Sequence, residues 1–311
     1  MSVLVTGGAG FIGSHVCERL LEEGNEVVCV DDFNDFYSPK TKKNNLSLLE
    51  CDNFTSIKAD IRDNKSLGKT FDGVDSVIHL AARAGIRPSI ENPLLYEDVN
   101  VKGTLNLLEL CRENEVDCLV FGSSSSVYGV NKKIPFSEDD RLSGPISPYA
   151  ATKIAGEALC HAYHHLYGIK TSILRLFTVY GPRGRPDMAV YKFTKLIDEG
   201  KPIQVYGGGT SKRDYTYVSD IVEGVVAAWK KKFDYEILNL GDSNTVELNQ
   251  LISLIENALE KTAKKRHLPE QPGDVPVTFA DISKSRRKLG YKPKVLIEEG
   301  IPRFAEWYKS V

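Results

Sequence analysis

The run VLVTGGAGFIGSHVCERLLEEG, residues 3–24, decides the fold of this chain. A short β-branched strand, Val3–Thr6, leads directly into a glycine-rich turn and then into an amphipathic helix, Phe11–Glu23. The turn has a GxxGxxG pattern formed by Gly7, Gly10 and Gly13. Because glycine has no side chain, the backbone can turn tightly there and approach a pyrophosphate, and the start of the helix offers free N–H groups. The run therefore predicts a unit that binds a dinucleotide.

Short β-branched runs alternate with longer amphipathic stretches through the first half of the chain. This alternation is typical of a parallel sheet that is covered by helices on both faces. The expected strands are Val3–Thr6, Glu26–Val30, Thr55–Lys58, Ser76–Leu80, Cys118–Gly122 and Thr171–Leu174, and the expected crossover helices are Phe11–Glu23, Asn92–Asn114 and Pro148–Tyr167. The pattern predicts an α/β fold with a doubly wound parallel sheet of the Rossmann kind.

The composition changes after Tyr180, where the sequence becomes rich in turn-forming Gly and Pro residues. This change predicts a smaller, loop-rich lobe that binds the substrate. The segment Tyr215–Leu240 again has the pattern of a helix followed by a strand. We therefore expect a cofactor-binding domain in residues 1–179, joined by residues 215–242, and a substrate lobe in residues 180–214 and 243–311.

The charge and composition of the chain disfavour some classes of binding partner. Forty basic and 42 acidic residues give a formal net charge of −2, which favours neither nucleic acid nor an anionic membrane as the main partner. No apolar stretch approaches the ~20 residues that a membrane-spanning helix needs, and no leader pattern precedes Val3, so we expect a cytoplasmic protein. The six cysteines lack metal-finger spacing, so we expect buried free thiols and no metal site.

Acidic residues follow two of the expected strands. Asp31 ends the second strand, eighteen residues after Gly13, where a carboxylate can bind an adenosine ribose. The same charge would repel a ribose phosphate, so NAD is favoured over NADP. Asp60, followed by Ile61, comes after the third strand and could either meet the adenine or cap a helix.

Tyr149 and Lys153 form a YxxxK pair on an expected helix, and the spacing of four places both on one face. A free tyrosine has a pKa near ~10, and a nearby cation such as Lys153 or a nicotinamide ring favours the phenolate. Tyr149 is therefore a candidate general base. The serines of the run 123–126 close the fifth strand, at the edge where ligands bind in open α/β sheets.

These motifs together resemble those of the extended short-chain dehydrogenase/reductase family, and the resemblance spans essentially the whole chain. It rests on GGAGFIG (7–13), HLAA (79–82), SSSSVYG (123–129) and SPYAATK (147–153). Within the family the chain is most similar to the UDP-glucuronate 4-epimerases, through DDFNDFY (31–37), AGIRPSIENP (84–93), LFTVYGPRGRPDMA (176–189) and KRDYTYVSD (212–220). Asp32 and Phe36 depart from the pattern, because relatives often carry Asn and Tyr there.

The resemblance implies an isomerase that uses bound NAD. Ser124, Tyr149 and Lys153 are its implied catalytic residues, and Lys153 also holds the nicotinamide ribose. Tyr149 would take the C4 hydroxyl proton of a UDP-sugar while NAD takes the C4 hydride, and the 4-keto sugar would turn over before the hydride returns. The implied cofactor contacts are Gly7, Gly10, Phe11, Ile12, Gly13, Asp31, Asp60, Ile61, Leu80, Ala81, Ala82, Tyr149 and Lys153. His79 is expected to pack and hydrogen-bond within its strand.

The expected substrate contacts are Arg87, Ser124, Ser125, Ser126, Tyr149, Thr178, Arg185, Arg213 and Asp274. Arg87 and Arg213 are candidates for the substrate pyrophosphate, because a guanidinium forks onto phosphate oxygens. By resemblance, Asp274 would bind the uridine ribose, and the hydroxyls at 125, 126 and 178 would bind the sugar carboxylate near the charge of Arg185. The alternatives are solvated arginines, a packed or capping threonine and a turn-forming Asp274.

The expected reaction is conversion of UDP-glucuronic acid to UDP-galacturonic acid. Ser125 and Ser126 occupy slots that carry acidic residues in the related dehydratases and decarboxylases, which argues for epimerisation. The alternatives are a UDP-glucose or UDP-N-acetylglucosamine 4-epimerase, a UDP-glucuronate decarboxylase and a silent NAD-binding scaffold. Family resemblance also predicts a homodimer through the helices at 92–114 and 148–167.

Overall fold

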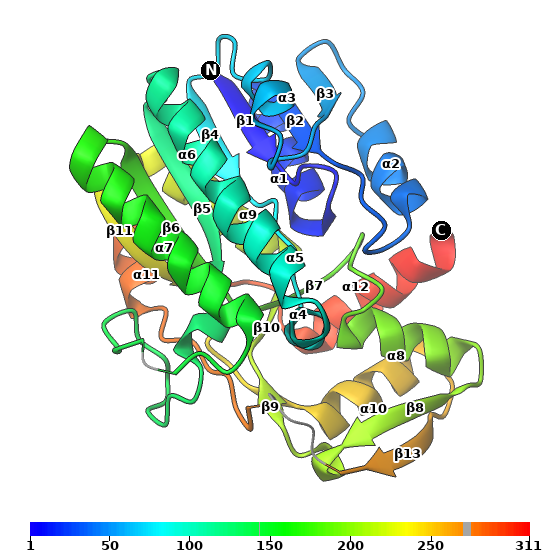
Figure 1. Cartoon of the computed structure of the whole chain (residues 1–311). Coiled ribbons are helices and arrows are strands. Elements are labelled where there is room, and N and C mark those ends of the chain that lie inside the picture. The colour runs from blue at the N-terminus through cyan, green and yellow to red at the C-terminus, as the bar shows by residue number, and fades with distance from the viewer. Residues whose placement is uncertain (143, 270–274) are drawn as a thin grey trace.

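A computed structural model describes residues 1–142, 144–269 and 275–311 (Figure 1). Its main feature is a sheet of seven strands in the order β11-β6-β5-β4-β1-β2-β3, and every pair of neighbours runs parallel. The strands are β1 (Ser2–Thr6), β2 (Glu26–Asp31), β3 (Phe54–Lys58), β4 (Ser76–His79), β5 (Cys118–Ser124), β6 (Lys170–Leu176) and β11 (Tyr235–Leu240). The six predicted strands and the doubly wound parallel sheet are confirmed.

Helices cover both faces of this sheet and bury two separate apolar cores. Successive residues of a strand point to opposite faces, so Val3 and Val5 join one core and Leu4 joins the other. The first core lies under α1 (Phe11–Glu22) and α9 (Val218–Lys231), and the second lies under α6 (Gly103–Glu113) and α7 (Pro148–Tyr167). Strands that are buried on both faces are typical of a parallel sheet, and they give the cavity at its edge a rigid support.

The helix expected over residues 92–114 is divided into three segments, so the prediction of one regular helix was wrong. These are α5 (Pro93–Glu97), a π-helical turn (Asp98–Lys102) and α6. Within the π turn the side chain of Asn100 faces the backbone of Arg83: it accepts from the Arg83 N–H at 2.7 Å and donates to the Arg83 carbonyl at 2.9 Å. The wider turn thus ties the helix to the segment that follows β4.

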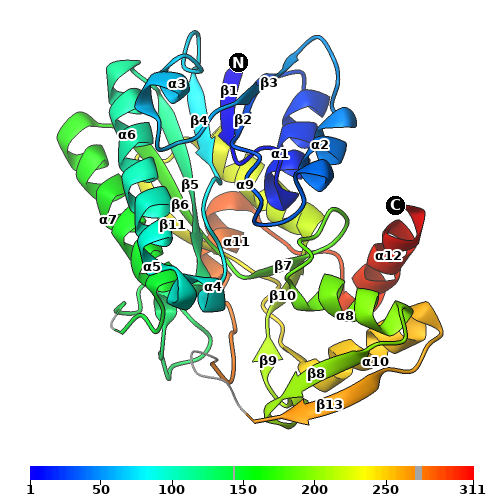
Figure 2. The same cartoon turned by 45° about the vertical axis from the view of Figure 1, so that its right-hand side comes forward.

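From Thr178 onward, most of the elements outside the main sheet form smaller sheets and helices, which Figure 2 shows below that sheet. β7 (Thr178–Tyr180) pairs with β10 (Tyr215–Tyr217), β8 (Pro202–Tyr206) with β13 (Lys264–Leu268), and β9 (Lys212–Arg213) with β12 (Val246–Glu247). Three helices accompany them: α8 (Ala189–Asp198), α10 (Leu248–Leu259) and α12 (Ile297–Ser310). β11 follows α9 and joins the main sheet beside β6, so the chain returns to that sheet.

Short elements complete the chain: α2 (Pro39–Ser47), α3 (Asn64–Gly68), α4 (Ile86–Glu91), α11 (Ser283–Leu289) and the 3₁₀ turns Ser125–Tyr128 and Gly207–Gly209. Within the described ranges, we find no helix with the length and apolar character to span a bilayer. All six cysteines are free thiols, as expected. Five are buried, but Cys51 is exposed, so the prediction of burial was wrong there because it lies in the loop before β3.

Candidate active site

A cavity of about 640 Å³ opens where the strand order changes direction, between β1 and β4. Ligands of open α/β sheets bind at such a point, outside the carboxyl ends of the strands. Among the candidate residues that the structure describes, all except Arg213 line the cavity: Gly7, Gly10, Phe11, Ile12, Gly13, Asp31, Asp60, Ile61, Leu80, Ala81, Ala82, Arg87, Ser124, Ser125, Ser126, Tyr149, Lys153, Thr178 and Arg185. Asp274 lies outside the described residues. The structure therefore brings segments from most of the chain to one place.

Arg213 lies on β9, where its Nη1 donates to the carbonyl of Lys212 at 2.9 Å. It lies outside the set of described residues that line the cavity. Arg87 does line the cavity, and its guanidinium lies 5.1 Å from the ring centre of Tyr206 at the end of β8. Arg87 therefore connects the cavity with the smaller sheets, whereas a contact between Arg213 and a ligand stays a prediction.

One part of the cavity, which we call the glycine-loop half, is formed by residues 7, 10–13, 31, 60–61 and 80–82. Gly7 has a φ of +70°, and a Cβ there would lie 2.8 Å from the amide nitrogen of Ala81. Gly10 precedes the first turn of α1 and provides no side-chain cap. The first N–H groups of the helix are therefore left to a ligand, and they carry the positive end of the helix dipole.

Asp31 ends β2 in a buried ion pair that the sequence analysis missed. Lys42 of α2 donates to its Oδ1 at 2.9 Å, and the backbone N–H of Phe33 donates to the same oxygen at 2.8 Å. Burial raises the pKa of Asp31, whereas the charge and hydrogen bond of Lys42 lower it. Lys42 therefore offsets part of the energetic penalty of burying a carboxylate at the cavity wall.

Asp60 lies in the cavity wall and does not cap a helix. Its carboxylate accepts from Arg62, with Nη2 2.6 Å from Oδ2, and this hydrogen bond lowers the pKa of Asp60. The cap of α3 is Asp63, whose Oδ1 accepts from the N–H of Lys65 at 3.1 Å. The alternative reading of Asp60 as a helix cap was therefore wrong.

The other part of the cavity, the serine-turn half, is formed by Ser124–Ser126, Tyr149, Thr178 and Arg185. Ser124 is the last residue of β5, and its Oγ accepts from the N–H of Ser126 at 3.2 Å. The hydrogen bond starts a 3₁₀ turn over Ser125–Tyr128, which we call the serine turn. The turn holds hydroxyl groups at the carboxyl edge of the sheet.

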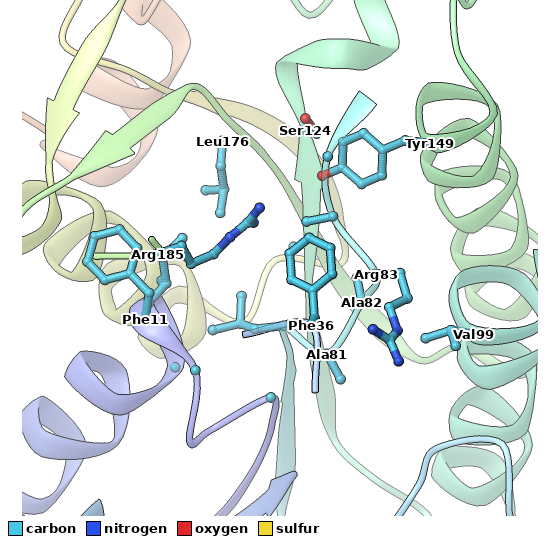
Figure 3. Close-up of a pocket in the computed structure, with 18 of the residues that line it drawn as sticks. Phe11, Phe36, Ala81, Ala82, Arg83, Val99, Ser124, Tyr149, Leu176 and Arg185 are labelled. Atoms are coloured by element: carbon cyan, nitrogen blue, oxygen red, sulfur yellow. The ribbon is translucent and has the colours of Figure 1, made fainter. Parts of the chain in front are cut away.

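Tyr149 lies in the first turn of α7. The helix starts there because the Oγ of Ser147 accepts from the N–H of Ala150 at 3.1 Å, and Pro148 favours the first helical position. Burial raises the pKa of Tyr149, whereas a hydrogen bond with Ser124 and the charge of Arg185 lower it. Figure 3 shows the phenol oxygen directed to Ser124. The groups that favour the phenolate are therefore Ser124 and Arg185.

Lys153 lies one turn further along α7 and is buried. Its Nζ donates to the carbonyl oxygen of Gly122 at 2.7 Å, and burial lowers the pKa of Lys153 to about 8. The prediction that Lys153 favours the phenolate of Tyr149 finds no support in these contacts, because the ammonium is directed to the carbonyl of β5. Lys153 nonetheless lines the cavity beside Tyr149.

Phe36 occupies the centre of the cavity, between two arginines (Figure 3). The guanidinium of Arg185 lies 5.3 Å from its ring centre and that of Arg83 lies 5.9 Å away. Arg185 also forks onto Asp187, with nitrogen-to-oxygen distances of 2.9 and 2.6 Å. The buried Nε of Arg83 has no hydrogen-bond partner among the described residues. Arg83 was not among the predicted site residues, although its place after HLAA at a strand end was a usable signal.

Fold and site together define a dinucleotide-binding α/β protein. The model of the NAD dependent epimerase/dehydratase family matches residues 3–241. UDP-glucuronate 4-epimerase of Thermodesulfobacterium geofontis is 47% identical over 311 residues, which are 99% of this chain and 96% of that protein. The chain therefore belongs to the NAD dependent epimerase/dehydratase family.

Solved structures agree with this membership. UDP-glucuronic acid 4-epimerase from Bacillus cereus, in complex with UDP-glucuronic acid and NAD, has a TM-score of 0.95 at 40% identity, covering 100% of this chain and 99% of that one. UDP-glucose 4-epimerase from Thermotoga maritima, with UDP-glucose, has a TM-score of 0.91 at 32% identity, with coverages of 100% and 99%. The relatives thus include epimerases of both an acidic and a neutral sugar.

Proposed function

We propose that this protein is a UDP-glucuronate 4-epimerase that interconverts UDP-glucuronic acid and UDP-galacturonic acid. The observation that carries the proposal is the convergence of Tyr149, Ser124 and Arg185 in one cavity with the glycine loop. The first two supply proton-transfer groups and the third supplies a positive charge. The similarity to UDP-glucuronate 4-epimerases over nearly the whole chain supports the same substrate.

The glycine-loop half fits NAD. At Gly7 the missing Cβ lets the turn pack directly against the backbone of Ala81, which keeps the glycine loop tight at the cavity where a pyrophosphate binds in this fold. Asp31 and Lys42 present a carboxylate held in place at the end of β2, where a ribose diol binds in this fold. When bound, NAD takes a hydride from C4 of the sugar and gives it back on the opposite face. We assign the holding of NAD to Gly7, Gly10, Phe11, Ile12, Gly13, Asp31, Asp60, Ile61, Leu80, Ala81, Ala82, Tyr149 and Lys153.

The serine-turn half supplies the proton chemistry. Tyr149 accepts the proton of the C4 hydroxyl, and Ser124 binds the same hydroxyl, because the phenol oxygen is directed to Ser124 and both side chains face the cavity. Lys153 holds the nicotinamide ribose from the same face of α7. In the second half of the cycle Tyr149 returns the proton to the oxygen on C4. No net redox change results.

The sugar carboxylate is proposed to bind in the serine-turn half. An unpaired buried charge is costly, and Ser125, Ser126 and Thr178 offer neutral donors while Arg185 offers a cation. The 4-keto form of glucuronic acid is a β-keto acid, so a carboxylate held by several donors cannot easily rotate into the alignment for CO₂ loss. Ser126 also replaces the acid expected of a decarboxylase. Epimerisation without decarboxylation follows.

The test is to incubate the purified protein with UDP-glucuronic acid, UDP-glucose and UDP-N-acetylglucosamine and to separate the products by chromatography. We expect UDP-galacturonic acid as the main product and a lower kcat/KM with the two neutral sugars. The second candidate is UDP-glucose 4-epimerase, which is favoured by the neutral hydroxyls, since they can equally hold a C6 hydroxymethyl group. A higher kcat/KM with UDP-glucose would replace the proposal by this candidate.

We further propose that the protein is a cytoplasmic homodimer. Large apolar side chains are exposed on the outer faces of α5, α6 and α7, with exposed fractions of 80% for Leu94, 38% for Leu105 and 64% for Leu166. Figure 1 shows these helices side by side. A second copy of the chain would cover them. Light scattering should give twice the mass of one chain, and a monomer would contradict the proposal.

The division of labour within the chain is also a proposal. We assign residues 1–179 and 215–242 to the cofactor domain, and residues 180–214 and 243–311 to the UDP-sugar lobe. The pairing of β11 with β6 supports the return of the chain to the main sheet. Arg87, Arg213 and Asp274 are assigned to the pyrophosphate and uridine of the substrate. Weaker inhibition by UDP after substitution of each residue would test these three assignments.

A further inference from the structure

A buried carboxylate, Glu157, lies two turns beyond Tyr149 on the same face of α7. Residues spaced by four share a helix face, so α7 directs three side chains at the carboxyl end of β5. The three side chains reach consecutive strand residues: Lys153 Nζ donates to the Gly122 carbonyl at 2.7 Å, Ser123 Oγ donates to Glu157 Oε1 at 2.5 Å, and the phenol oxygen of Tyr149 is directed to Ser124 (Figure 3). The side chains that align α7 with the end of β5 therefore include one charged group, Glu157, that lies outside the lining of the cavity.

Arg175 of β6 binds the same carboxylate of Glu157 that accepts from Ser123. Its Nε donates to Glu157 Oε1 at 3.0 Å and its Nη2 donates to Oε2 at 2.8 Å, with both side chains buried. Its Nη1 donates to the hydroxyl of Tyr128 at 3.1 Å, and its guanidinium lies 5.0 Å from the Tyr128 ring centre. Tyr128 is the last residue of the serine turn, and its hydroxyl donates to Asn239 Oδ1 at 2.7 Å.

Glu157 and Arg175 therefore hold both ends of the serine turn, Ser123 before it and Tyr128 at its end. The residues between these anchors, Ser124–Ser126, line the cavity. A buried ion pair adds little net stability, because desolvating two charges offsets their attraction, but its fork geometry is specific. Specific geometry is what a proton-transfer site requires, since a displacement of about 1 Å can reduce the rate on the order of 100-fold.

We propose that Glu157, held by Arg175, is a positioning residue that sets the serine turn against Tyr149 and Lys153 for proton transfer. The inference rests on the proposed function, because it concerns the geometry of the same reaction. Glu157 lies behind β5 and outside the lining of the cavity among the described residues, so it acts through Ser123 and through the charge of Lys153. Burial lowers the pKa of Lys153, and the neighbouring Cys160 and the negative charge of Glu157 raise it.

The test is Glu157→Gln, which keeps the shape and removes the charge. We expect kcat for UDP-glucuronic acid to fall by roughly 10- to 100-fold, with KM and the NAD dissociation constant changed by less than about threefold. We also expect the alkaline limb of the kcat profile to move to lower pH, because the anion that favours the charged form of Lys153 is gone. If the substitution only damaged the structure, kcat would fall at every pH and the alkaline limb of the pH profile would not move.

Two further variants separate the effects. Ser123→Ala removes the hydroxyl bond but keeps the ion pair, so kcat should fall several-fold while the alkaline limb stays. Ser76→Ala is the matched control, since it removes a buried hydrogen bond of 2.8 Å from Trp229 Nε1 at the opposite end of the sheet. It should leave kcat and the limb unchanged. If Glu157→Gln does not fold, the pair Glu157→Gln and Arg175→Gln leaves no unpaired charge and is measured in its place.

Hydrogen exchange of residues 124–128 provides a readout without the reaction. Faster exchange in the Glu157 variant and unchanged exchange in Ser76→Ala are expected. Equal kcat, equal pH limb and equal exchange in the Glu157 variant and the control would overturn the inference. Failure of the wild-type protein to convert any UDP-sugar would instead contradict the proposed function, and the exchange measurement would still decide the positioning.

Discussion

The two halves of the cavity are built on different principles. The glycine-loop half presents mainly backbone, from one β-α turn and the ends of neighbouring strands, and its main side-chain charge is an aspartate fixed by Lys42. The serine-turn half presents side chains that come from a strand end, from α7, from β7 and from the loop that carries Arg185. The first half should therefore be sensitive to backbone geometry, and the second half to single functional groups.

The largest effect is expected from removing one atom in the serine-turn half. Tyr149→Phe should lower the turnover of UDP-glucuronic acid by ~10²–10⁴-fold, because the proton acceptor is lost. The affinity for NAD and for the UDP-sugar should remain, as measured by isothermal titration calorimetry. Tyr163→Phe is the control on the same helix, since its hydroxyl binds Glu109 away from the cavity. Turnover of the Tyr149 variant within a few-fold of wild type would assign the base to another group.

A smaller and substrate-selective effect is expected at Arg185. Arg185→Gln removes a charge that lies in the cavity and acts on Tyr149. A hydrogen bond to a charged group contributes about 1.5–3 kcal/mol, so kcat/KM for UDP-glucuronic acid should fall roughly 10- to 100-fold. UDP-glucose has no carboxylate and is the internal control, so its kcat/KM should fall less. Equal losses with both substrates would show that Arg185 does not bind the carboxylate.

The glycine-loop half should respond to a backbone change instead. Gly7→Ala places a Cβ 2.8 Å from the Ala81 nitrogen at a φ of +70°. Both variants carry the strain of a left-handed residue, but only at Gly7 must the loop move away from Ala81, so the NAD dissociation constant should rise about tenfold, or roughly 1.4 kcal/mol. Gly24→Ala is the matched control, because Gly24 has a φ of +76° with nothing within 4 Å of a Cβ. Calorimetry should show an unchanged NAD affinity for the control, and an equal loss in both variants would contradict the argument.

The same difference explains how far the sequence could be interpreted. The strands, Asp31 and the glycine loop depend on local patterns, and the structure places them as predicted. Lys42 could not be found that way, because KTKKNN has no period that marks a buried lysine, and its partner Asp31 is set only by the packing of α2. Sequence spacing also placed Lys153 beside Tyr149 but could not show that its ammonium is directed to a carbonyl of β5.

The two halves share one buried polar chain beneath them, centred on His79. Thr104 Oγ1 donates to the Asn100 carbonyl at 2.6 Å, so it must accept the bond from His79 Nε2 at 3.1 Å. His79 Nδ1 is then an acceptor, at 2.6 Å from Thr6 Oγ1. The expectation that His79 packs and hydrogen-bonds is confirmed, but its side-chain partners lie on β1 and α6 and not in its own strand. Thr6 directly precedes the glycine loop and Thr104 lies in α6, so the neutral ring of His79 links that loop to α6.

The smallest expected effect is therefore on stability at mildly acidic pH. Burial lowers the pKa of His79 to about 3, while an unfolded histidine titrates near ~6.5. Between these values the unfolded chain binds the extra proton, so stability from this group is present at higher pH and is lost as the pH falls below about 6.5. His79 alone should reduce the unfolding free energy by about 0.7 kcal/mol from pH 7 to pH 6.

Urea unfolding at pH 7 and pH 6 measures this loss as a difference between two proteins. His79→Gln should be less stable than wild type at both values, because two buried hydrogen bonds are disturbed, but it cannot take up the proton. Between pH 7 and pH 6, the unfolding free energy of the His79→Gln variant should therefore fall by about 0.7 kcal/mol less than that of the wild type. Because the carboxylates and the other histidines titrate identically in both proteins, their contributions cancel in the comparison. An equal pH dependence in the two proteins would mean that the pKa of His79 is the same in the folded protein as in the unfolded chain, and would contradict the prediction.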